Sequence, residues 1–383
     1  MRVALFTDTF YPQVNGVART LKRLTDHMQK RDIDCEIFVP EMEDGPSYPN
    51  VNQFSSLPFI FYPECRAAIA NPSKITDRLR TFSPDLVHVT TPLTMGLYGA
   101  HAAKKLNIPL VASYHTHFDQ YLDYYKLTWL NPLLWRYMKW FHQPCERIFV
   151  PSEETKSHLE AQGFHSLAVW ARGVDCDLYT PKKKTTWLRE QYQIKEKYIF
   201  LYVGRLAPEK DLKTLTAIME NISPELQKQV HWVIVGNGPS YSDLLQHTAE
   251  RDNITLTGYL KGEKLAMTYA EADLFIFPSP TETFGNVVLE ALASGTPGIV
   301  ANEGGVKEII EHDQTGYICQ ARDADSFIQS IEDIMLQSTK RVIMSQNARK
   351  YALAQSWDQI LDDLLSEYEE VIQFKKNPMA KLA

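Results

Sequence analysis

Short runs of apolar residues, many of them β-branched or aromatic, alternate along the chain with longer amphipathic stretches. In the first half the predicted strands are Arg2–Phe6, Cys35–Val39, Leu86–Val89, Leu110–Ser113 and Arg147–Val150. In the second half they are Tyr198–Val203, Trp232–Val235, Ile254–Leu256, Leu274–Phe277 and Gly298–Val300. Such short, continuously apolar runs are typical of strands buried on both faces. Their alternation with helix-length segments predicts right-handed βαβ units and parallel sheets.

The alternating pattern occurs twice, with a break near residues 172–185 where Gly173, Pro181 and a run of three lysines interrupt it. We therefore predict an α/β protein of two doubly wound, Rossmann-like domains, residues 1–172 and 173–357. A strongly acidic helix within 358–383 is expected to pack back on the first domain. Ligands of such folds bind outside the carboxyl ends of the strands, so we expect the site in a cleft between two facing domains.

Composition narrows the class of protein. The 383 residues are 44% hydrophobic and 23% charged, which is typical of a soluble globular protein. The net charge of −7 does not favour a nucleic-acid partner. No apolar run approaches the roughly 20 residues that span a bilayer, and no signal peptide is recognised. The cysteines are five in number, scattered and unpaired in spacing, so neither a disulfide framework nor a zinc site is expected. The expected location is the cytoplasm.

The first motif with chemical meaning follows the predicted strand Tyr198–Val203. It is Gly204-Arg205-Leu206-Ala207-Pro208-Glu209-Lys210, which places two cations five residues apart at the start of a helix. Arginine presents a planar fork to phosphate and lysine a point charge, and a helix N-terminus adds backbone amides and a positive field. The alternative is a solvated loop in which Arg205 pairs with Glu209.

A second motif runs from Glu282 to Glu290 and contains Phe284-Gly285-Asn286-Val287. The pattern predicts a loop leading into a helix, with Glu282 before the helix and Glu290 inside it. Carboxylates accept hydrogen bonds from vicinal sugar hydroxyls, and amides near Gly285 would bind hydroxyls or phosphate oxygens. The alternative is a capped helix with Glu290 as a surface acid.

Three shorter motifs follow other strands. Gly16 lies between the first strand and a helix, where a missing side chain would let backbone approach a phosphate. Gly236-Asn237-Gly238-Pro239 reads as a turn, and His115 and His117 follow the fourth strand. Simple turns and structural histidines are the alternatives. Asp175-Cys176-Asp177 matches the Asp-x-Asp motif of metal-dependent sugar transferases, but it lies in the interdomain break, where acids cap turns. We predict no catalytic metal and no cofactor.

The stretch 129–142 predicts an amphipathic helix, with Asn131 as N-cap and Pro132 at the first helical position. Its apolar face is formed by Leu130, Leu133, Leu134, Tyr137, Met138 and Phe141. The other positions carry Trp129, Trp135, Arg136, Lys139 and Trp140. Tryptophan beside basic residues suits the interface of an anionic membrane. An ordinary core helix is the alternative.

Taken together, these motifs resemble retaining glycosyltransferase family 4, which has the GT-B fold. Further matches are Gly295-Thr296-Pro297, Gly304-Gly305 followed by Glu308, and Thr315-Gly316, so the resemblance covers the whole chain in order. Among its members, the lipid-directed ones are most similar, such as sulfoquinovosyl-diacylglycerol synthase and glycolipid mannosyltransferases. Val17 and Arg172 depart from the glycine and asparagine that many members have there.

The resemblance implies roles for individual residues. Arg205 and Lys210 would hold the donor diphosphate, Glu290 the ribose, and Glu282 the transferred sugar. Phe284, Gly285, Asn286 and Val287 would add donor contacts, Leu260 and Gly238 would border the nucleotide, and Gly16 would approach the diphosphate. His115 would lie by the donor sugar and acceptor. The implied reaction is metal-independent transfer of a hexose, with retention, from a UDP-glucose-like or GDP-mannose-like donor. The implied acceptor is a glycerolipid or lipid-linked glycan.

Other functions remain open on the sequence. They are transfer to a soluble or cell-wall polysaccharide, a GT-B epimerase or phosphorylase, and a non-catalytic sugar-nucleotide binding subunit. A nicotinamide-dependent dehydrogenase is disfavoured because Gly236-x-Gly238 is followed by Tyr241 where its motif requires glycine.

Overall fold

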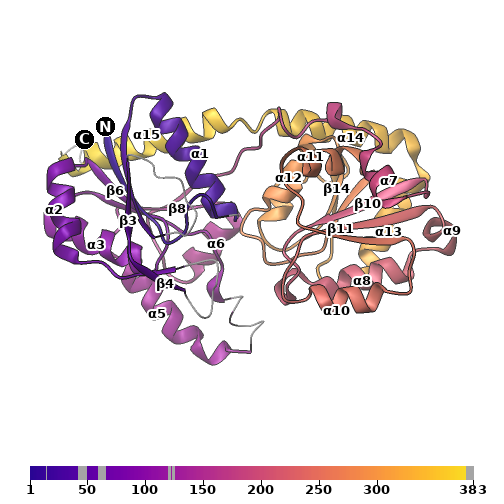
Figure 1. Ribbon diagram of the computed structural model, residues 1–383, viewed down its shortest axis with the longest axis horizontal. Helices are drawn as coiled ribbons and strands as arrows, with labels where there is room; N and C mark the ends of the chain where they lie inside the picture. The colour runs from indigo at the N-terminus through magenta and orange to yellow at the C-terminus, as the bar shows by residue number, and fades with distance from the viewer. Residues whose placement is uncertain (14, 42–49, 59–65, 120–121, 123–125, 377–383) are drawn as a thin grey trace. The chain divides into compact units, whose positions relative to one another are not determined.

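The computed structural model describes residues 1–13, 15–41, 50–58, 66–119, 122 and 126–376. The chain forms two compact units (Figure 1). The first contains Met1–Asp119, Leu127–Ala171 and the C-terminal segment from Asp358, and the second consists mainly of Arg172–Trp357. Among the described residues, no helix combines the length and apolarity needed to cross a membrane.

The first unit is built on a parallel sheet with the strand order β3-β2-β1-β6-β7-β8-β9. Its strands are β1 (Arg2–Phe6), β2 (Asp34–Pro40), β3 (Val51–Phe54), β6 (Leu86–Val89), β7 (Leu110–Ser113), β8 (Arg147–Val150) and β9 (Leu167–Val169). β4 (Ser56–Pro58) and β5 (Arg66–Ala68) pair as a separate antiparallel sheet. The helices are α1 (Gly16–Lys30), α2 (Pro72–Phe82), α3 (Thr94–Leu106), α5 (Asn131–His142) and α6 (Glu153–Ala161), with a 3₁₀ turn η1 (Thr128–Leu130). The central strands are buried on both faces, which explains their continuously apolar sequences.

The second unit repeats the architecture around a parallel sheet ordered β12-β11-β10-β13-β14-β15. Its strands are β10 (Tyr198–Val203), β11 (Val230–Val235), β12 (Ile254–Gly258), β13 (Leu274–Phe277), β14 (Gly298–Ala301) and β15 (Gly316–Cys319). The helices are α7 (Trp187–Tyr192), α8 (Leu212–Asn221), α9 (Pro224–Gln227), α10 (Tyr241–Thr248), α11 (Gly262–Glu271), α12 (Asn286–Ala293), α13 (Ala324–Leu336) and α14 (Ser338–Leu353), with 3₁₀ turns η2 (Pro181–Lys183), η3 (Pro208–Lys210) and η4 (Gly305–Glu308). Helices α8 and α10 lie on one side of this sheet and α11 and α14 on the other (Figure 1). Two doubly wound parallel sheets are the predicted fold class, which is confirmed.

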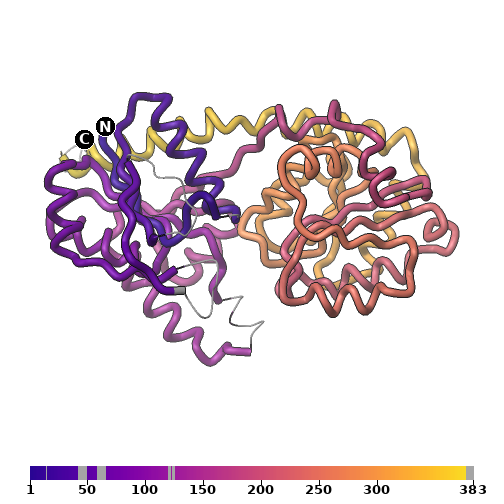
Figure 2. Tube along the Cα trace, viewed as in Figure 1, coloured from indigo at the N-terminus to yellow at the C-terminus, as the bar shows by residue number. Residues whose placement is uncertain are grey.

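The last helix, α15 (Trp357–Lys376), runs beside α1 of the first unit (Figure 2). Acidic residues of α15 form ion pairs at the C-terminal end of α1. The Asp362 carboxylate contacts His27 Nε2 at 2.7 Å and also pairs with Arg31. On its buried side, the Tyr368 hydroxyl lies 2.6 Å from Nδ1 of His88 in β6. These contacts fix the C-terminal segment to the first sheet.

Helix α5 differs from its prediction in two respects. It begins at Asn131, so Asn131 is the first helical residue rather than its N-cap, and no side chain caps this end. Leu133 was expected on the core face but is 64% exposed, whereas Met138 and Phe141 are buried as predicted. The core therefore covers a narrower part of the helix than its apolar residues suggested.

Candidate active site

Several predicted site residues lie on loops at one edge of the second sheet. Arg205 and Lys210 follow β10, Gly238 follows β11, Leu260 follows β12 and Glu282 follows β13. These strands are neighbours in the order β12-β11-β10-β13. Because they are parallel, their carboxyl ends share an edge. The topology therefore brings together residues that are up to 77 positions apart in the sequence (Arg205 to Glu282).

Both candidate cations of this edge are next to carboxylates. Lys210 Nζ donates a hydrogen bond of 2.5 Å to Glu282 Oε1, and the two side chains are 11% and 22% exposed. Arg205 Nη1 lies 3.6 Å from Glu209 Oε1, and Glu209 is completely buried. The Arg205–Glu209 pair is therefore no solvated surface pair. It places positive charge beside a buried acid, and a diphosphate would meet two cations that are already held in position.

The start of α8 corrects one part of the sequence analysis. Asp211, in a left-handed conformation with φ of 51°, is the N-cap of α8. Its carboxylate accepts a 2.6 Å hydrogen bond from the Thr214 hydroxyl and faces the Thr214 amide at 3.4 Å. An acid thus already occupies the position where an anion would meet the helix dipole. An anion at this edge would therefore meet the positive charges of the Arg205 and Lys210 side chains and not the amides at the start of α8.

The glycines after β11 are required by packing between loops. A Cβ on Gly236 would lie 1.9 Å from the carbonyl oxygen of Gly204, and one on Gly238 would lie 2.3 Å from that of Leu206. The Leu206 amide also donates to the Asn237 carbonyl at 3.0 Å. The loop after β11 therefore supports the backbone of the loop that carries Arg205.

The second motif forms a loop and a short helix. Glu282 precedes α12, and Gly285, with φ of 102°, is the N-cap. A side chain at Gly285 would collide with Val306 at 2.6 Å, so the turn can be this tight only with glycine. No side chain caps α12. Phe284, Asn286 and Val287 lie at this end, which is suited to an anion or to hydroxyl groups.

Glu290 lies inside α12 and is only 9% exposed, so it is not a surface acid. Its Oε2 accepts a 3.0 Å hydrogen bond from the hydroxyl of Tyr269 in α11. This bond orients the carboxylate. The sequence analysis did not identify Tyr269, because nothing in the local pattern connects it with Glu290.

In the first unit, Gly16 and His115 follow β1 and β7, which lie on either side of β6. Both residues are therefore at the carboxyl edge of this sheet. Gly16 is the first residue of α1, whose N-cap Asn15 accepts a 2.8 Å hydrogen bond from the Ala18 amide. The His115 ring lies edge-on to Trp170, with 5.8 Å between ring centroids.

Asp8, just after β1, is a buried acid whose part in the structure the sequence did not reveal. Its carboxylate accepts 2.6 Å hydrogen bonds from the hydroxyls of Thr91 and Thr94, and a 2.9 Å bond from the Met95 amide. Burial raises the pKa of Asp8, and these hydrogen bonds oppose that shift. Asp8 thus ties the loop after β1 to the start of α3.

The Asp-x-Asp sequence acts as a turn cap, as the sequence analysis favours. The Asp175 carboxylate accepts a 3.0 Å hydrogen bond from the Leu178 amide, and the Cys176 thiol contacts the carbonyl of Ala352.

Comparisons with known proteins cover nearly the whole chain. Residues 14–178 match the family described as Glycosyltransferase Family 4, and residues 184–351 match Glycosyl transferases group 1. The chain is 30% identical over 378 residues to a GDP-mannose-dependent alpha-mannosyltransferase of Mycobacterium tuberculosis, covering 97% of both chains. It is 28% identical over 349 residues to an alpha-monoglucosyldiacylglycerol synthase of Streptococcus pneumoniae, covering 84% of this chain and 78% of that one.

Among solved structures, a sucrose-phosphate synthase from Thermosynechococcus elongatus matches with a TM-score of 0.78 at 19% identity, covering 97% of this chain and 99% of that one. This likeness concerns the fold. Together with the full-length relative and the two family matches, it shows that this chain belongs to glycosyltransferase family 4, has the GT-B fold and is a hexosyltransferase.

Proposed function

We propose that this protein transfers a hexose, with retention and without a catalytic metal, from a nucleotide-diphosphate sugar to a lipid or lipid-linked acceptor. The observation that carries the proposal is the gathering of Arg205, Lys210 and Glu282 on neighbouring loops at one edge of the second sheet. Two cations suit a diphosphate, and carboxylates suit sugar hydroxyls.

On the donor side, Arg205 and Lys210 hold the diphosphate, and Glu290, oriented by Tyr269, accepts hydrogen bonds from the ribose hydroxyls. The uncapped start of α12 adds amides around Gly285. Leu260 is half-buried beside the second core and offers an apolar contact for the base. Gly16 and His115 lie at the carboxyl edge of the first sheet, and their contacts with the donor stay predictions.

In the reaction, the bond between the anomeric carbon and the diphosphate oxygen breaks while the acceptor hydroxyl oxygen bonds to the same carbon. The acceptor proton moves to an oxygen of the departing diphosphate on the same face, which retains the anomeric configuration. Negative charge develops on the leaving group, so fixed cations stabilise the transition state more than the ground state. One such donor is typically worth about 3–4 kcal/mol.

The printed names of the relatives support the choice of donor and acceptor class. The relative that matches over 97% of both chains is GDP-mannose-dependent, and another is a monoglucosyldiacylglycerol synthase. GDP-mannose and UDP-glucose are therefore the first donors to test, with diacylglycerol and phospholipid as acceptors.

An exposed stripe on the first unit supports a membrane-bound acceptor. Trp129, Leu133 and Trp140 are 73%, 64% and 59% exposed, and Arg136 is exposed between them. The spacings of four, three and four residues place all four along one line of α5 and the preceding turn. Trp135, in contrast, packs against His158 and Phe164, so it belongs to the core.

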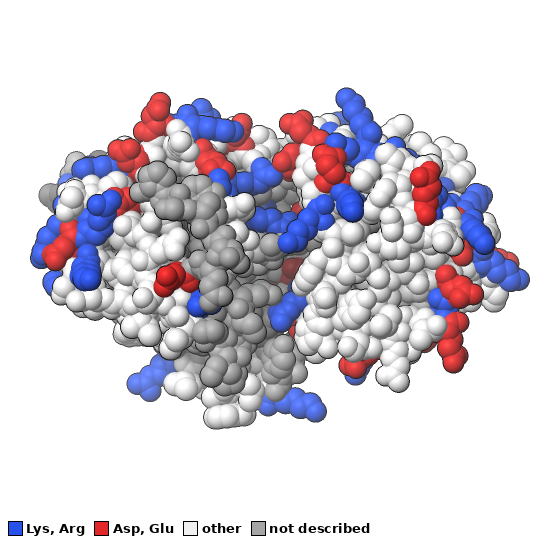
Figure 3. Space-filling model, viewed as in Figure 1, with Lys and Arg blue, Asp and Glu red and all other residues white. Residues whose placement is uncertain are grey.

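The overall charge of the chain does not favour general adhesion to an anionic membrane. On the face in view, acidic and basic side chains are interspersed among the described residues (Figure 3), and the net charge is −7. We therefore propose local attachment to an anionic bilayer through the stripe Trp129-Leu133-Arg136-Trp140 and the adjacent, exposed Lys139.

The donor assay screens nucleotide-sugars for thermal stabilisation, then measures transfer with chelator present. A ligand at 100 times its dissociation constant adds about 2.7 kcal/mol to stability. The proposal requires a stabilising donor, transfer by the folded protein with chelator present, and an unchanged anomeric configuration in the product by NMR. Inverted product, or loss of transfer with chelator while the melting temperature stays unchanged, would refute the mechanism.

The membrane assay sediments the protein with anionic vesicles. Near such a surface each Lys or Arg contributes about 1 kcal/mol, so the double variant Arg136→Gln/Lys139→Gln should bind about 30-fold more weakly at low salt. The matched control, Lys213→Gln/Lys228→Gln, neutralises two exposed lysines of the second unit and should bind normally. Equal binding of both double variants, or no vesicle binding by the wild type, would exclude this surface.

A further inference from the structure

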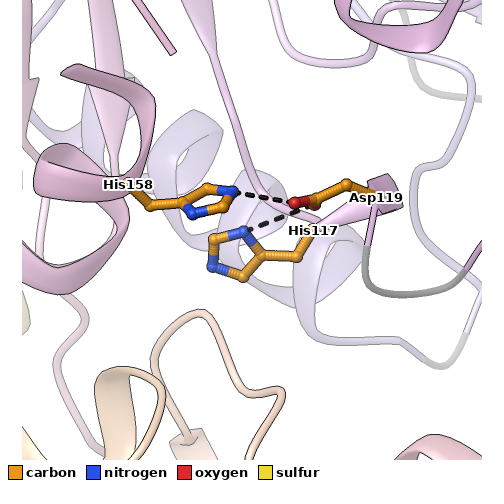
Figure 4. A group of neighbouring side chains, drawn as sticks. All are labelled: His117, Asp119 and His158. Atoms are coloured by element: carbon orange, nitrogen blue, oxygen red, sulfur yellow. Dashed lines mark hydrogen bonds and ion pairs between the residues drawn. The ribbon is translucent and has the colours of Figure 1, made fainter. Parts of the chain in front are cut away.

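A cluster of metal-binding side chains lies in the first unit. His117 and Asp119 are in the segment after β7, and His158 is on α6 (Figure 4). The Asp119 carboxylate faces one nitrogen of each ring: Oδ2 is 2.9 Å from His158 Nε2, and Oδ1 is 4.0 Å from His117 Nδ1. One ligand atom from each residue falls within 4.8 Å of the others.

These separations suit one first-row transition ion. Zinc binds histidine nitrogen and carboxylate oxygen at about 2.0–2.2 Å, so two ligands of a tetrahedral ion are about 3.4 Å apart. The two measured distances of 2.9 and 4.0 Å lie on either side of that value. Small side-chain rotations would bring the three ligand atoms to one ion and leave a coordination position for water.

The surroundings fix the imidazoles as a metal site requires. His117 Nε2 is 3.4 Å from the Thr155 hydroxyl, so Nδ1 is the nitrogen turned towards Asp119. The Trp135 ring packs against His158, with 5.6 Å between centroids, and the two histidine rings meet edge to face at 5.0 Å. The contact of His117 Nε2 with the Thr155 hydroxyl is typical of metal-binding histidines, because an oxygen at the second ring nitrogen commonly orients the ring.

A plain ion pair explains the cluster less well. Asp119 and His158 would suffice for it, whereas the side chain of His117 is only 2% exposed and is turned to the same carboxylate. Burying a second positive charge, at His117, against the same carboxylate is costly. One divalent ion with two neutral imidazoles satisfies all three groups.

We propose that His117, Asp119 and His158 bind a divalent transition ion, Zn²⁺ above all, that ties the segment after β7 to α6. The ion has a structural role, and the proposal does not depend on the proposed sugar transfer. Imidazole and carboxylate ligands favour zinc, cobalt or nickel over magnesium or calcium.

The experiment uses the full-length, tag-free chain, stripped with chelator and titrated with Zn²⁺ against a chromophoric competitor. Co²⁺ serves as the spectroscopic probe, since its visible absorption reports nitrogen and oxygen ligation. We expect one tight equivalent per chain. His158→Gln and Asp119→Asn should each weaken binding at least ~10-fold, and zinc should raise the melting temperature of the wild type but not of these two variants.

The matched control is His247→Gln, because His247 also pairs with an acid, Glu220, at 2.7 Å, but within the described part of the chain this pair belongs to no group of three metal-binding side chains. It should bind zinc as the wild type does. His158 is partly exposed, so its variant should fold, which circular dichroism checks before titration. No stoichiometric zinc in the wild type, or equal affinity in all folded variants, would overturn the proposal.

Discussion

Replacing Lys210 with methionine tests the donor site most directly. The change removes the ammonium group and its 2.5 Å bond to Glu282 but keeps most of the apolar stem. Because Glu282 is 22% exposed, water can solvate its carboxylate after the change. Loss of such a partly exposed pair costs about 1 kcal/mol of folding stability. Loss of a cation from the developing charge costs about 3–4 kcal/mol in the transition state, which is a few hundredfold in turnover.

The assay compares transfer rate and melting temperature with those of Lys340→Met. Lys340 also forms an ion pair, at 2.6 Å with Asp313, and belongs to the same unit. Asp313 precedes β15, so this pair lies towards the amino ends of the parallel strands and not at the candidate site. Both variants should melt slightly below the wild type, and only Lys210→Met should lose transfer.

The double variant Lys210→Met/Glu282→Gln distinguishes phosphate binding from simple charge neutralisation. Because Glu282 is itself assigned to the transferred sugar, Glu282→Gln alone is the reference. If Lys210 serves only to neutralise Glu282, the double variant should be as active as Glu282→Gln. If Lys210 holds the diphosphate, the double variant should be far less active than Glu282→Gln. A double variant as active as Glu282→Gln, or a Lys210→Met variant within a few-fold of the wild type, would refute the assignment.

Three other predictions concern packing, orientation and pH. Gly238→Ala would place Cβ 2.3 Å from a neighbouring carbonyl oxygen, whereas the Cβ of Gly262→Ala would meet nothing within 4 Å and costs only the strain of its φ of 54°. The urea midpoint of Gly238→Ala should therefore fall well below that of Gly262→Ala, and equal midpoints would contradict the packing argument. Tyr269→Phe removes the hydrogen bond that orients the Glu290 carboxylate for donor binding. It should raise the donor KM several-fold and leave kcat nearly unchanged. An unchanged KM would refute the role of Tyr269. Burial lowers the pKa of His142 to about 4 from 6.5, so the unfolded chain takes up a proton first as the pH falls. The first unit should lose up to roughly 3 kcal/mol between pH 6.5 and 4, measured by hydrogen exchange over residues 131–142 in urea, and His142→Gln should flatten this dependence.

The central strands could be predicted closely from sequence because burial on both faces demands an unbroken apolar run. β1, β6, β7, β8, β10 and β13 have the bounds that the pattern predicts. The edge strands β3, β9 and β15 were missed. The residues of β3 and β9 are half-buried or exposed, so their sequences carry no continuous apolar signal. β15 (Gly316–Cys319) is mostly buried, but it is short and begins with glycine.

The sequence also indicated which loops carry chemistry, since charged and glycine-rich motifs followed the predicted strands directly. Parallel topology alone then placed these loops at one edge of each sheet. What the pattern could not show was the environment of each side chain. Glu290 looked like a possible surface acid, yet it is buried and bonded to Tyr269, 21 residues earlier.

The sequence by itself therefore determined the two α/β units, their central strands and the family, because these depend on local periodicity and on motifs in a fixed order. The tertiary structure decided which distant groups meet. His158 joins His117 and Asp119 although about 40 residues separate them, Asp8 caps α3, and Leu133 of α5 is left exposed. The physical reason is that hydrogen bonding and burial depend on neighbours in space, and packing of the whole unit chooses those neighbours.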